Sequence, residues 1–434
     1  MEFEEEKKND NNLNQEQEQE QVDDIFMDIL SEGLPEEDPL LVEENDNVDD
    51  VSSEDSEELL QDLDWESTDD EEWNPGNWLQ QYALIPGLSQ QFPSNVNQVE
   101  DSFLLLFDNE IIGLLVEETN RYATQFFTRF PEKRGEYYYK EWEGCNTALM
   151  KAYLGILVHM GLSQFPRLVY HWKSSAHFSC SFCPNVMKRN KFFIMHKFFH
   201  ITDNSRANND DRLFKIRPLL ELLVTKFQSF YVLNKELSID ERIVKYTGRL
   251  SFRQYIPNKP VKLGIKMFVL ADSRTGYIWN WQVYSGASVG RRANAIHNLM
   301  VELTESLRNR GHFLYFDSYY TFVPIVRYLA TKGFGSVGMI KKNRRLIPDE
   351  IKNPPSTLQQ RESVFMTANN LMCFAFRDRK VVRILTNCYG TQIGEDGRPL
   401  ALIDYNNWMR AVMSRLTENR DFFSVRKFTK KTFQ

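Results

Sequence analysis

Apolar residues recur at spacings of three and four along the chain from Ser102 onward. The first such run consists of Phe103, Leu106, Phe107, Ile111, Leu114 and Leu115. This spacing places the side chains on one face of an α-helix. The same period continues over residues 147–161, 188–200 and 217–231. We therefore predict a mostly helical block over residues 99–235.

The hydrophobic period changes at Leu237, where strand-like runs rich in β-branched and aromatic residues begin. Such runs, separated by turn-forming segments like 272–276, are typical of strands. Two later segments return to helical spacing. In chain order, the pattern predicts strands at 237–246, 262–271 and 277–284, a helix at 293–308, a strand at 312–317, a helix at 323–331 and a strand at 335–340. This order predicts a mixed α/β layer.

The remaining chain divides into a second β-rich segment and a basic end. Residues 346–394 begin with prolines and then alternate as strands at 371–376 and 381–385, which indicates a small β insertion. Residues 405–424 have the pattern of a closing helix, and basic residues follow it.

Charge separates an acidic tail from a basic body. The 61 acidic and 52 basic residues give a net charge of −9, but residues 1–72 alone hold 31 Asp and Glu against two lysines. The rest then carries 50 basic and 30 acidic residues, a net charge of +20. Many like charges and few apolar clusters predict a disordered tail over 1–98, with serines that suit acid-directed kinases and acids that suit basic proteins. A basic body is typical of nucleic-acid-binding proteins, although a solvated surface without a partner has the same composition.

Other classes find little support in the sequence. No apolar run reaches the ~18 residues of a membrane-spanning helix, and the N-terminus lacks the pattern of a signal peptide. The five cysteines are few and odd in number, which suits free thiols in a reducing compartment. We therefore expect no membrane segment and no disulfide framework.

Several short motifs occur in the order in which piggyBac-type transposases carry them. They are Phe107-Asp108, Glu-Thr-Asn-Arg-Tyr-Ala (118–123), Lys-Ile-Arg-Pro-Leu (215–219), Leu-Ser-Ile-Asp-Glu (237–241), Gln-Tyr-Ile-Pro-Asn-Lys-Pro (254–260), Gly-Ile-Lys (264–266), Thr-Gly-Tyr (275–277), Phe-Asp-Ser-Tyr-Tyr-Thr (316–321) and Tyr405-Asn406. Each motif alone is weak. Their shared order makes the chain resemble this family over about residues 100–431.

The resemblance implies an α/β fold with an RNase H-like catalytic core and a small β insertion. A mostly helical DNA-binding and dimerisation domain and the acidic tail would precede the core. The implied boundaries are 1–98 for the tail, 99–235 for the helical domain, 236–345 for the first part of the core, 346–394 for the insertion, and 395–434 for the closing helix and a truncated basic end. Family members cut and paste DNA with a divalent ion, normally magnesium. Duplex DNA, a homodimer and the nucleus are therefore the implied partner, assembly and location.

Two aspartates match catalytic positions of the family, and the third position has changed. Asp240 and Asp317 match the first two catalytic aspartates, although Asp is also common at the ends of strands. The family pattern Tyr-Asn-x-x-Met-Gly-Gly-Val-Asp places the third where this chain has Met413. A thioether is a poor magnesium ligand, and rescue by Glu418 would need a shift of more than one helical turn. We therefore expect Asp240 and Asp317 to bind magnesium weakly and the core to have lost DNA cleavage.

Basic residues near the first strands and at the C-terminal end are candidate phosphate contacts. They are Arg242, Lys245, Arg249, Arg253, Lys259, Lys262, Lys266, Arg426, Lys427, Lys430 and Lys431. Contacts of this kind give affinity and salt dependence without sequence choice.

One spacing suggests a zinc finger. Cys180-x2-Cys183-x12-His196-x3-His200 fits the C2H2 pattern. The family, however, has a continuous helix in this region and needs no cysteines there. We therefore favour free thiols over bound zinc, with a zinc finger as the alternative.

These features together predict a domesticated, transposase-derived nuclear protein that binds DNA without cleaving it. Two alternatives stay open. One is an active, metal-dependent cut-and-paste transposase or nuclease that uses a substitute acid. The other is a dimerising interaction scaffold whose acidic tail recruits partners.

Overall fold

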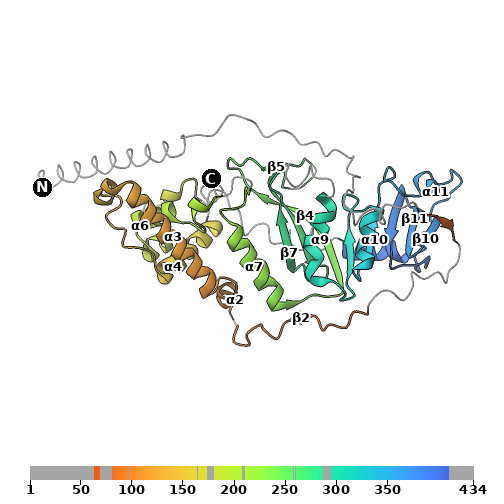
Figure 1. Ribbon diagram of the computed structural model, residues 1–434, viewed down its shortest axis with the longest axis horizontal. Coiled ribbons are helices and arrows are strands. Elements are labelled where there is room, and N and C mark those ends of the chain that lie inside the picture. Colours follow the sequence, from red (N-terminus) through yellow and green to blue (C-terminus); the bar gives the residue numbers. More distant parts are fainter. Residues whose placement is uncertain are drawn as a thin grey trace, which may run out of the picture. The chain divides into compact units, whose positions relative to one another are not determined.

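The computed structural model describes residues 63–68, 81–96, 98–163, 165–173, 180–207, 211–257, 259, 261–286 and 295–409. Its α-helices (Figure 1) are α2 (Val99–Leu106), α3 (Asn109–Arg129), α4 (Thr147–Leu162), α5 (Phe182–Val186), α6 (Arg189–Phe198), α7 (Arg217–Phe230), α9 (Ala295–Thr304), α10 (Val323–Thr331), α11 (Asp349–Lys352) and α12 (Leu400–Trp408). Its strands are β1 (Glu66–Ser67), β2 (Gly87–Leu88), β3 (Tyr231–Val232), β4 (Glu236–Lys245), β5 (Gln254–Tyr255), β6 (Leu263–Asp272), β7 (Ile278–Val283), β8 (Phe313–Phe316), β9 (Gly335–Met339), β10 (Ser363–Ala368), β11 (Leu371–Arg377) and β12 (Val381–Thr386). Within these residues, no helix is both long and apolar enough to cross a membrane.

Helices α2 to α7 lie within the predicted helical block, and capping side chains set where the long helices α3 and α4 begin. The Asp108 carboxylate accepts hydrogen bonds from the backbone N–H groups of Glu110 and Ile111 at 3.1 and 3.2 Å. Asn146 caps α4 in the same way, at 2.8 Å from the N–H of Leu149. Such caps satisfy N–H groups that the first helical turn leaves free. The apolar faces of α3, α4 and α6 share a core that contains Ile112, Leu115, Tyr153, Ile156, Phe192 and Met195.

A ten-stranded mixed sheet forms the second half of the fold. Its order is β1-β10-β11-β12-β9-β8-β4-β6-β5, and β7 also pairs with β6. Strands β4, β8 and β9 run parallel to one another, whereas β6 and β7 continue antiparallel from β4. At Gly264 of β6, an added Cβ would lie 2.1 Å from the carbonyl oxygen of Val244. Only glycine therefore allows β4 and β6 to approach this closely.

The short strand β8 is covered on both faces, which explains its unbroken apolar sequence. Leu314 and Phe316 belong to a core shared with α9 and α10, whereas Tyr315 belongs to a second core shared with α12. Successive residues of a strand face opposite sides. Helices α9 and α10 therefore cover one face of the sheet and α12 covers the other.

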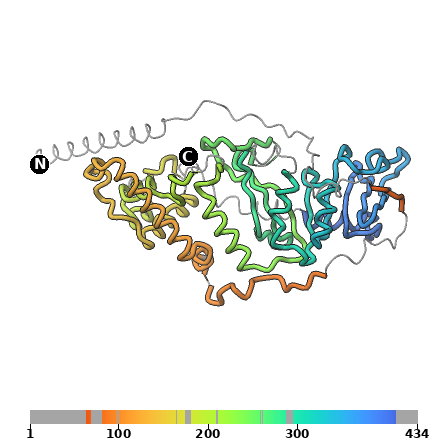
Figure 2. Tube along the Cα trace, in the orientation of Figure 1, coloured from red at the N-terminus to blue at the C-terminus, as the bar shows by residue number. Residues whose placement is uncertain are grey.

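The predicted small β insertion is part of the main sheet. Strand β12 pairs antiparallel with β9, with Ile384 opposite Met339. Strands β11 and β10 then follow outward, so the sheet extends from β9 into the blue part of the chain (Figure 2). Strand β10 was missed by the sequence pattern. Once β9 offers an open edge, pairing with it satisfies backbone groups that a separate small sheet would leave exposed.

The prediction that residues 1–98 lack structure is wrong for two short stretches. Glu66 and Ser67 pair with β10 at the outer edge of the sheet, and the Trp65 indole donates to the carbonyl oxygen of Leu346 at 2.9 Å. Gly87 and Leu88 pair with β3. The acidic composition of the segment gave no sign of these contacts. Each two-residue strand forms only because a distant part of the chain supplies the strand with which it pairs.

Candidate metal and nucleic-acid site

The parallel pairing of β4 and β8 brings the two predicted catalytic aspartates together. The register places Ile239 opposite Phe316, so the next residues, Asp240 and Asp317, are neighbours at this edge. Asp317 also ends β8. Its carboxylate accepts a hydrogen bond from the backbone N–H of Tyr319 at 2.9 Å, and this local bond competes with strand pairing.

A buried arginine holds the loop that follows Asp317. Arg344 is 5% exposed, and its Nη2 atom donates to the carbonyl oxygens of Ser318 and Tyr319 at 3.1 and 3.0 Å. Within this loop, the Thr321 hydroxyl donates to the carbonyl oxygen of Asp317 at 2.7 Å. Hydrogen bonds to Asp317 itself and to the loop that follows it therefore fix the position of this aspartate.

A third carboxylate joins the two aspartates, and the sequence did not single it out. One carboxylate oxygen each from Asp240, Glu241 and Asp317 lies within 4.8 Å of the others. The Tyr320 hydroxyl donates to Glu241 at 3.2 Å. Neighbouring strand residues usually face opposite sides, which is why the Asp-Glu pair gave no signal beyond its place in a family motif.

The Lys259 ammonium compensates part of this negative charge. It lies 2.9 Å from Glu241 and 3.7 Å from Asp240, and its side chain is only 19% exposed. Burial and then the Glu241 charge raise the pKa of Asp240, and the same two causes raise the pKa of Asp317. Burial opposes ionisation of Glu241 too, but the charges of Lys259 and Lys266 outweigh it and lower the pKa of Glu241. Glu241 is thus the most readily ionised carboxyl group of the three.

The donor set fits a hard divalent cation by its chemistry. Magnesium prefers carboxylate and water oxygens, and three such side chains converge here. A cation would compete with the Lys259 ammonium, which already pairs with two of these carboxylates, Asp240 and Glu241.

Helix α12 passes beside the acidic cluster, but the third family position lies beyond it. Burial, followed by the charges of Asp317 and Asp240, raises the pKa of Tyr405 on this helix. Asp404, the neighbouring acid, accepts a 2.5 Å hydrogen bond from Tyr389 instead of joining the site. Met413 and Glu418 lie outside the described residues.

The candidate phosphate contacts divide into two groups. Lys245, Arg249 and Lys262 are exposed around β4, β5 and β6. Two other lysines lie at the acidic site instead. Lys259 pairs with Glu241, and Lys266, which is 7% exposed, lies over the Tyr319 ring. Arg253 donates to the carbonyl oxygens of Thr247 and Gly248, and Arg242 is half-buried. The basic residues from 426 to 431 lie outside the described part of the chain.

The C2H2 pattern is not assembled. His196 Nδ1 lies 2.8 Å from the Tyr153 hydroxyl, and the His200 ring stacks on Tyr122 with a centroid distance of 3.6 Å. Cys180 and Cys183 lie beside His159 and His171 instead. The spacing therefore identified two members of a Cys/His cluster and assigned them the wrong histidines.

Comparison with known proteins gives the class that this fold and site define. The sequence profile described as Transposase IS4 matches residues 100–432, and the chain belongs to this DDE transposase family. PiggyBac transposable element-derived protein 2 of Homo sapiens is 25% identical over 328 residues, which cover 73% of this chain and 52% of the relative. PiggyBac transposable element-derived protein 3 of Homo sapiens is 26% identical over 246 residues, which cover 55% of this chain and 39% of the relative. Within the family, the chain is therefore of piggyBac type, as its motifs predict.

A solved structure extends this relationship to the fold. The cryo-EM structure of the piggyBac transposase synaptic complex with hairpin DNA aligns with a TM-score of 0.68 and 24% identity, over 79% of this chain and 72% of that one. The chain spans about half the length of the curated relatives that it matches.

Proposed function

We propose that this chain is a transposase-derived nuclear protein that binds duplex DNA and does not cleave it. The observation that carries the proposal is the acidic site on the strand order β7-β6-β4-β8-β9, which supports the RNase H-like core included in this proposal. Asp240 and Asp317 meet there, while Met413 stands at the third catalytic position of the family pattern. The two aspartates lie close together, and the sequence lacks the third ligand of the family pattern.

Duplex DNA is the partner that the charges favour. The exposed Lys245 ends β4, which carries Asp240 and Glu241, whereas the exposed Arg249 follows β4 and the exposed Lys262 directly precedes β6. The solved relative is described as a complex with hairpin DNA, and its fold is shared. Phosphate contacts of this kind weaken steeply as salt displaces them.

The acidic side chains have defined roles in this proposal. Asp240, Glu241 and Asp317 would hold a divalent ion, which in a two-metal site activates the attacking oxygen and stabilises the leaving one. Lys259 holds two of these carboxylates by charge, and Arg344 positions the loop that carries Asp317. Without the third family aspartate, a second ion would lack a ligand.

The test scores binding and nicking on one labelled duplex over a magnesium and a manganese titration. We expect binding without nicking, and a log–log salt slope that becomes shallower by about 1 for each of Lys245→Ala, Arg249→Ala and Lys262→Ala. Asp240→Asn should leave the salt slope unchanged. Absence of binding, or binding that does not respond to salt, would contradict the proposal.

A second function is favoured by one observation, the position of Glu241. Because its carboxylate joins the two aspartates, it could replace the missing acid in a metal-dependent nuclease. This alternative predicts that the wild-type chain nicks DNA and that Asp317→Ala and Glu241→Gln each abolish nicking while duplex binding stays intact. That result would establish the alternative and refute the first proposal.

The same proposal includes a homodimer, nuclear location and a tail that binds basic proteins or is phosphorylated. Light scattering of the purified chain tests the dimer, and imaging of a tagged chain tests the location. A pull-down that depends on residues 1–98, in a protein without measurable DNA binding, would favour the scaffold alternative.

A further inference from the structure

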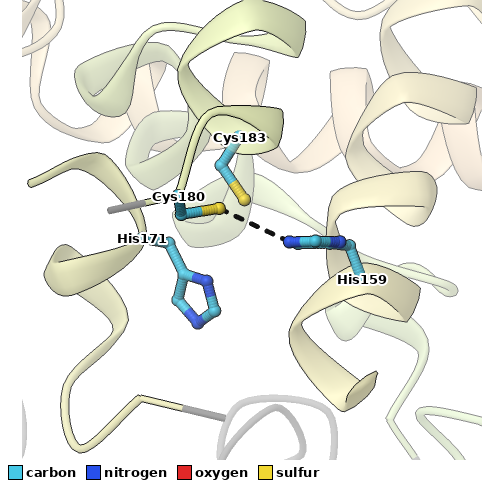
Figure 3. Close-up of side chains that lie close together, drawn as sticks. All are labelled: His159, His171, Cys180 and Cys183. Carbon is cyan, nitrogen blue, oxygen red and sulfur yellow. Dashed lines mark hydrogen bonds between the residues drawn. The ribbon is translucent and has the colours of Figure 1, made fainter. Parts of the chain in front are cut away.

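Two histidines and two cysteines converge within the helical region (Figure 3). His159 lies near the end of α4, and His171 lies in the 3-10 helix η4 (Leu168–Trp172). Cys180 precedes α5, and Cys183 lies within α5. One ligand atom from each side chain lies within 4.8 Å of all the others. Cys180 Sγ lies 3.4 Å from His159 Nε2.

The cluster is buried and its polar atoms are incompletely paired. His171 is 2% exposed, and its Nδ1 atom has no hydrogen-bond partner among the described residues. Cys183 is fully buried, and Cys180 and Cys183 are free thiols. Leaving a buried polar atom unpaired costs about 1–3 kcal/mol. A ligand shared by the four side chains would remove that cost.

We propose that His159, His171, Cys180 and Cys183 bind a structural zinc ion. Two sulfur and two imidazole nitrogen donors are the set that tetrahedral zinc takes in proteins. Two thiolates balance the two positive charges of the ion, so the complex is neutral and its burial avoids the cost of an isolated charge. All four positions are filled by protein, which leaves no open position for a substrate.

The contacts around the cluster show what the ion would fasten. The Trp172 indole donates to the carbonyl oxygen of Met187 at 2.8 Å, which joins η4 to the end of α5. The Phe182 ring stacks on His159 at a centroid distance of 4.4 Å, which joins α5 to α4. Zinc would add a direct link among these three elements. The site is separate from the acidic cluster, and it differs from the sequence-based preference for free thiols at Cys180 and Cys183.

The test measures the metal content of the purified full-length chain and its cobalt spectrum. We expect one zinc per chain, and after exchange with cobalt a visible spectrum of a tetrahedral ion with thiolate charge-transfer absorption. Cys183→Ser and His171→Gln should each lower zinc affinity by about tenfold or more. Zinc should also slow the alkylation of Cys180 and Cys183 in the wild-type chain, a readout that needs no variant to fold.

Two matched controls separate this site from the rival patterns. His200→Gln removes a histidine of the C2H2 spacing, and Cys145→Ser removes a buried thiol outside the cluster. Both variants should keep the zinc. A wild-type chain that takes up neither zinc nor cobalt under reducing conditions would overturn the proposal, and so would zinc retained by both cluster variants or lost from His200→Gln.

Discussion

Replacing Lys259 by methionine tests whether this lysine holds the acidic site together. Methionine keeps most of the apolar stem and removes the charge. At an effective dielectric constant of about 20, the contacts of 2.9 Å to Glu241 and 3.7 Å to Asp240 correspond to attractions of about 6 and about 4 kcal/mol. Desolvation of the ammonium opposes these attractions, and loss of one partner from a buried pair typically costs about 3–5 kcal/mol.

Protonation limits the loss, because burial already raises the pKa of both aspartates. A carboxyl group that takes up a proton no longer repels its neighbours. We therefore expect Lys259→Met to lower the free energy of unfolding by about 2–3 kcal/mol at neutral pH. Manganese at about 100 times its dissociation constant should restore about 2.7 kcal/mol, because it binds only the folded chain.

The assay is urea unfolding of the full-length chain, followed by fluorescence, with and without manganese. The exposed Lys262 provides the matched control, and Lys262→Met should change the free energy of unfolding by less than about 0.5 kcal/mol. The reasoning is refuted if Lys259→Met is as stable as the wild type, or if manganese stabilises both proteins equally.

Three further predictions test other parts of the fold. Burial lowers the pKa of His312 from 6.5 to about 4. Because the unfolded chain takes up this proton at a higher pH than the folded chain does, about 3 kcal/mol of folding stability should be lost as the pH falls from about 6.5 to about 4. His312→Asn should flatten that pH profile in thermal unfolding. Arg344→Ala should destabilise the chain by about 2 kcal/mol and weaken manganese binding in calorimetry, whereas Arg345→Ala, at an exposed position, should do neither. Trp65→Ala should cost about 1–2 kcal/mol in urea unfolding if β1 is docked as described, and no change would show that this edge contact adds nothing.

Most helices and strands were predictable where the hydrophobic pattern continued over many residues or where a capping or turn-forming residue marked the end of the element. Helix α4 follows three- and four-residue spacing and begins at the Asn146 cap. Strand β8 is an apolar run closed by Asp317. Strand β1 was not predictable, because its partner β10 lies about 300 residues away along the chain.

Candidate sites divided in the same way. Asp240 and Asp317 could be selected from the sequence because each stands in a family motif beside a predicted strand. The parallel pairing of β4 and β8 then places the two aspartates next to each other. Glu241 was not singled out, because neighbouring residues of a strand usually face opposite sides and no pattern in the sequence places it with Asp240. For the Cys/His cluster, C-x2-C spacing identified Cys180 and Cys183, but a spacing rule supplies only local partners. The structure brings His159 and His171 from earlier elements, and only the path of the chain determines which histidines arrive.

The acidic site would have a structural reason to persist without catalysis. Lys259 binds Glu241 and Asp240, the Tyr320 hydroxyl donates to Glu241, and backbone N–H groups bind the aspartates. Loss of Asp240 or Glu241 would remove a counter-charge of the buried Lys259, so folding alone selects against it. Retention of these two acids therefore reports the stability of the sheet as well as any chemistry. An active site is distinguished from an inherited structural ion network by one result. In an active site, substitution of Asp317 alone and substitution of Glu241 alone each abolish the cutting of DNA.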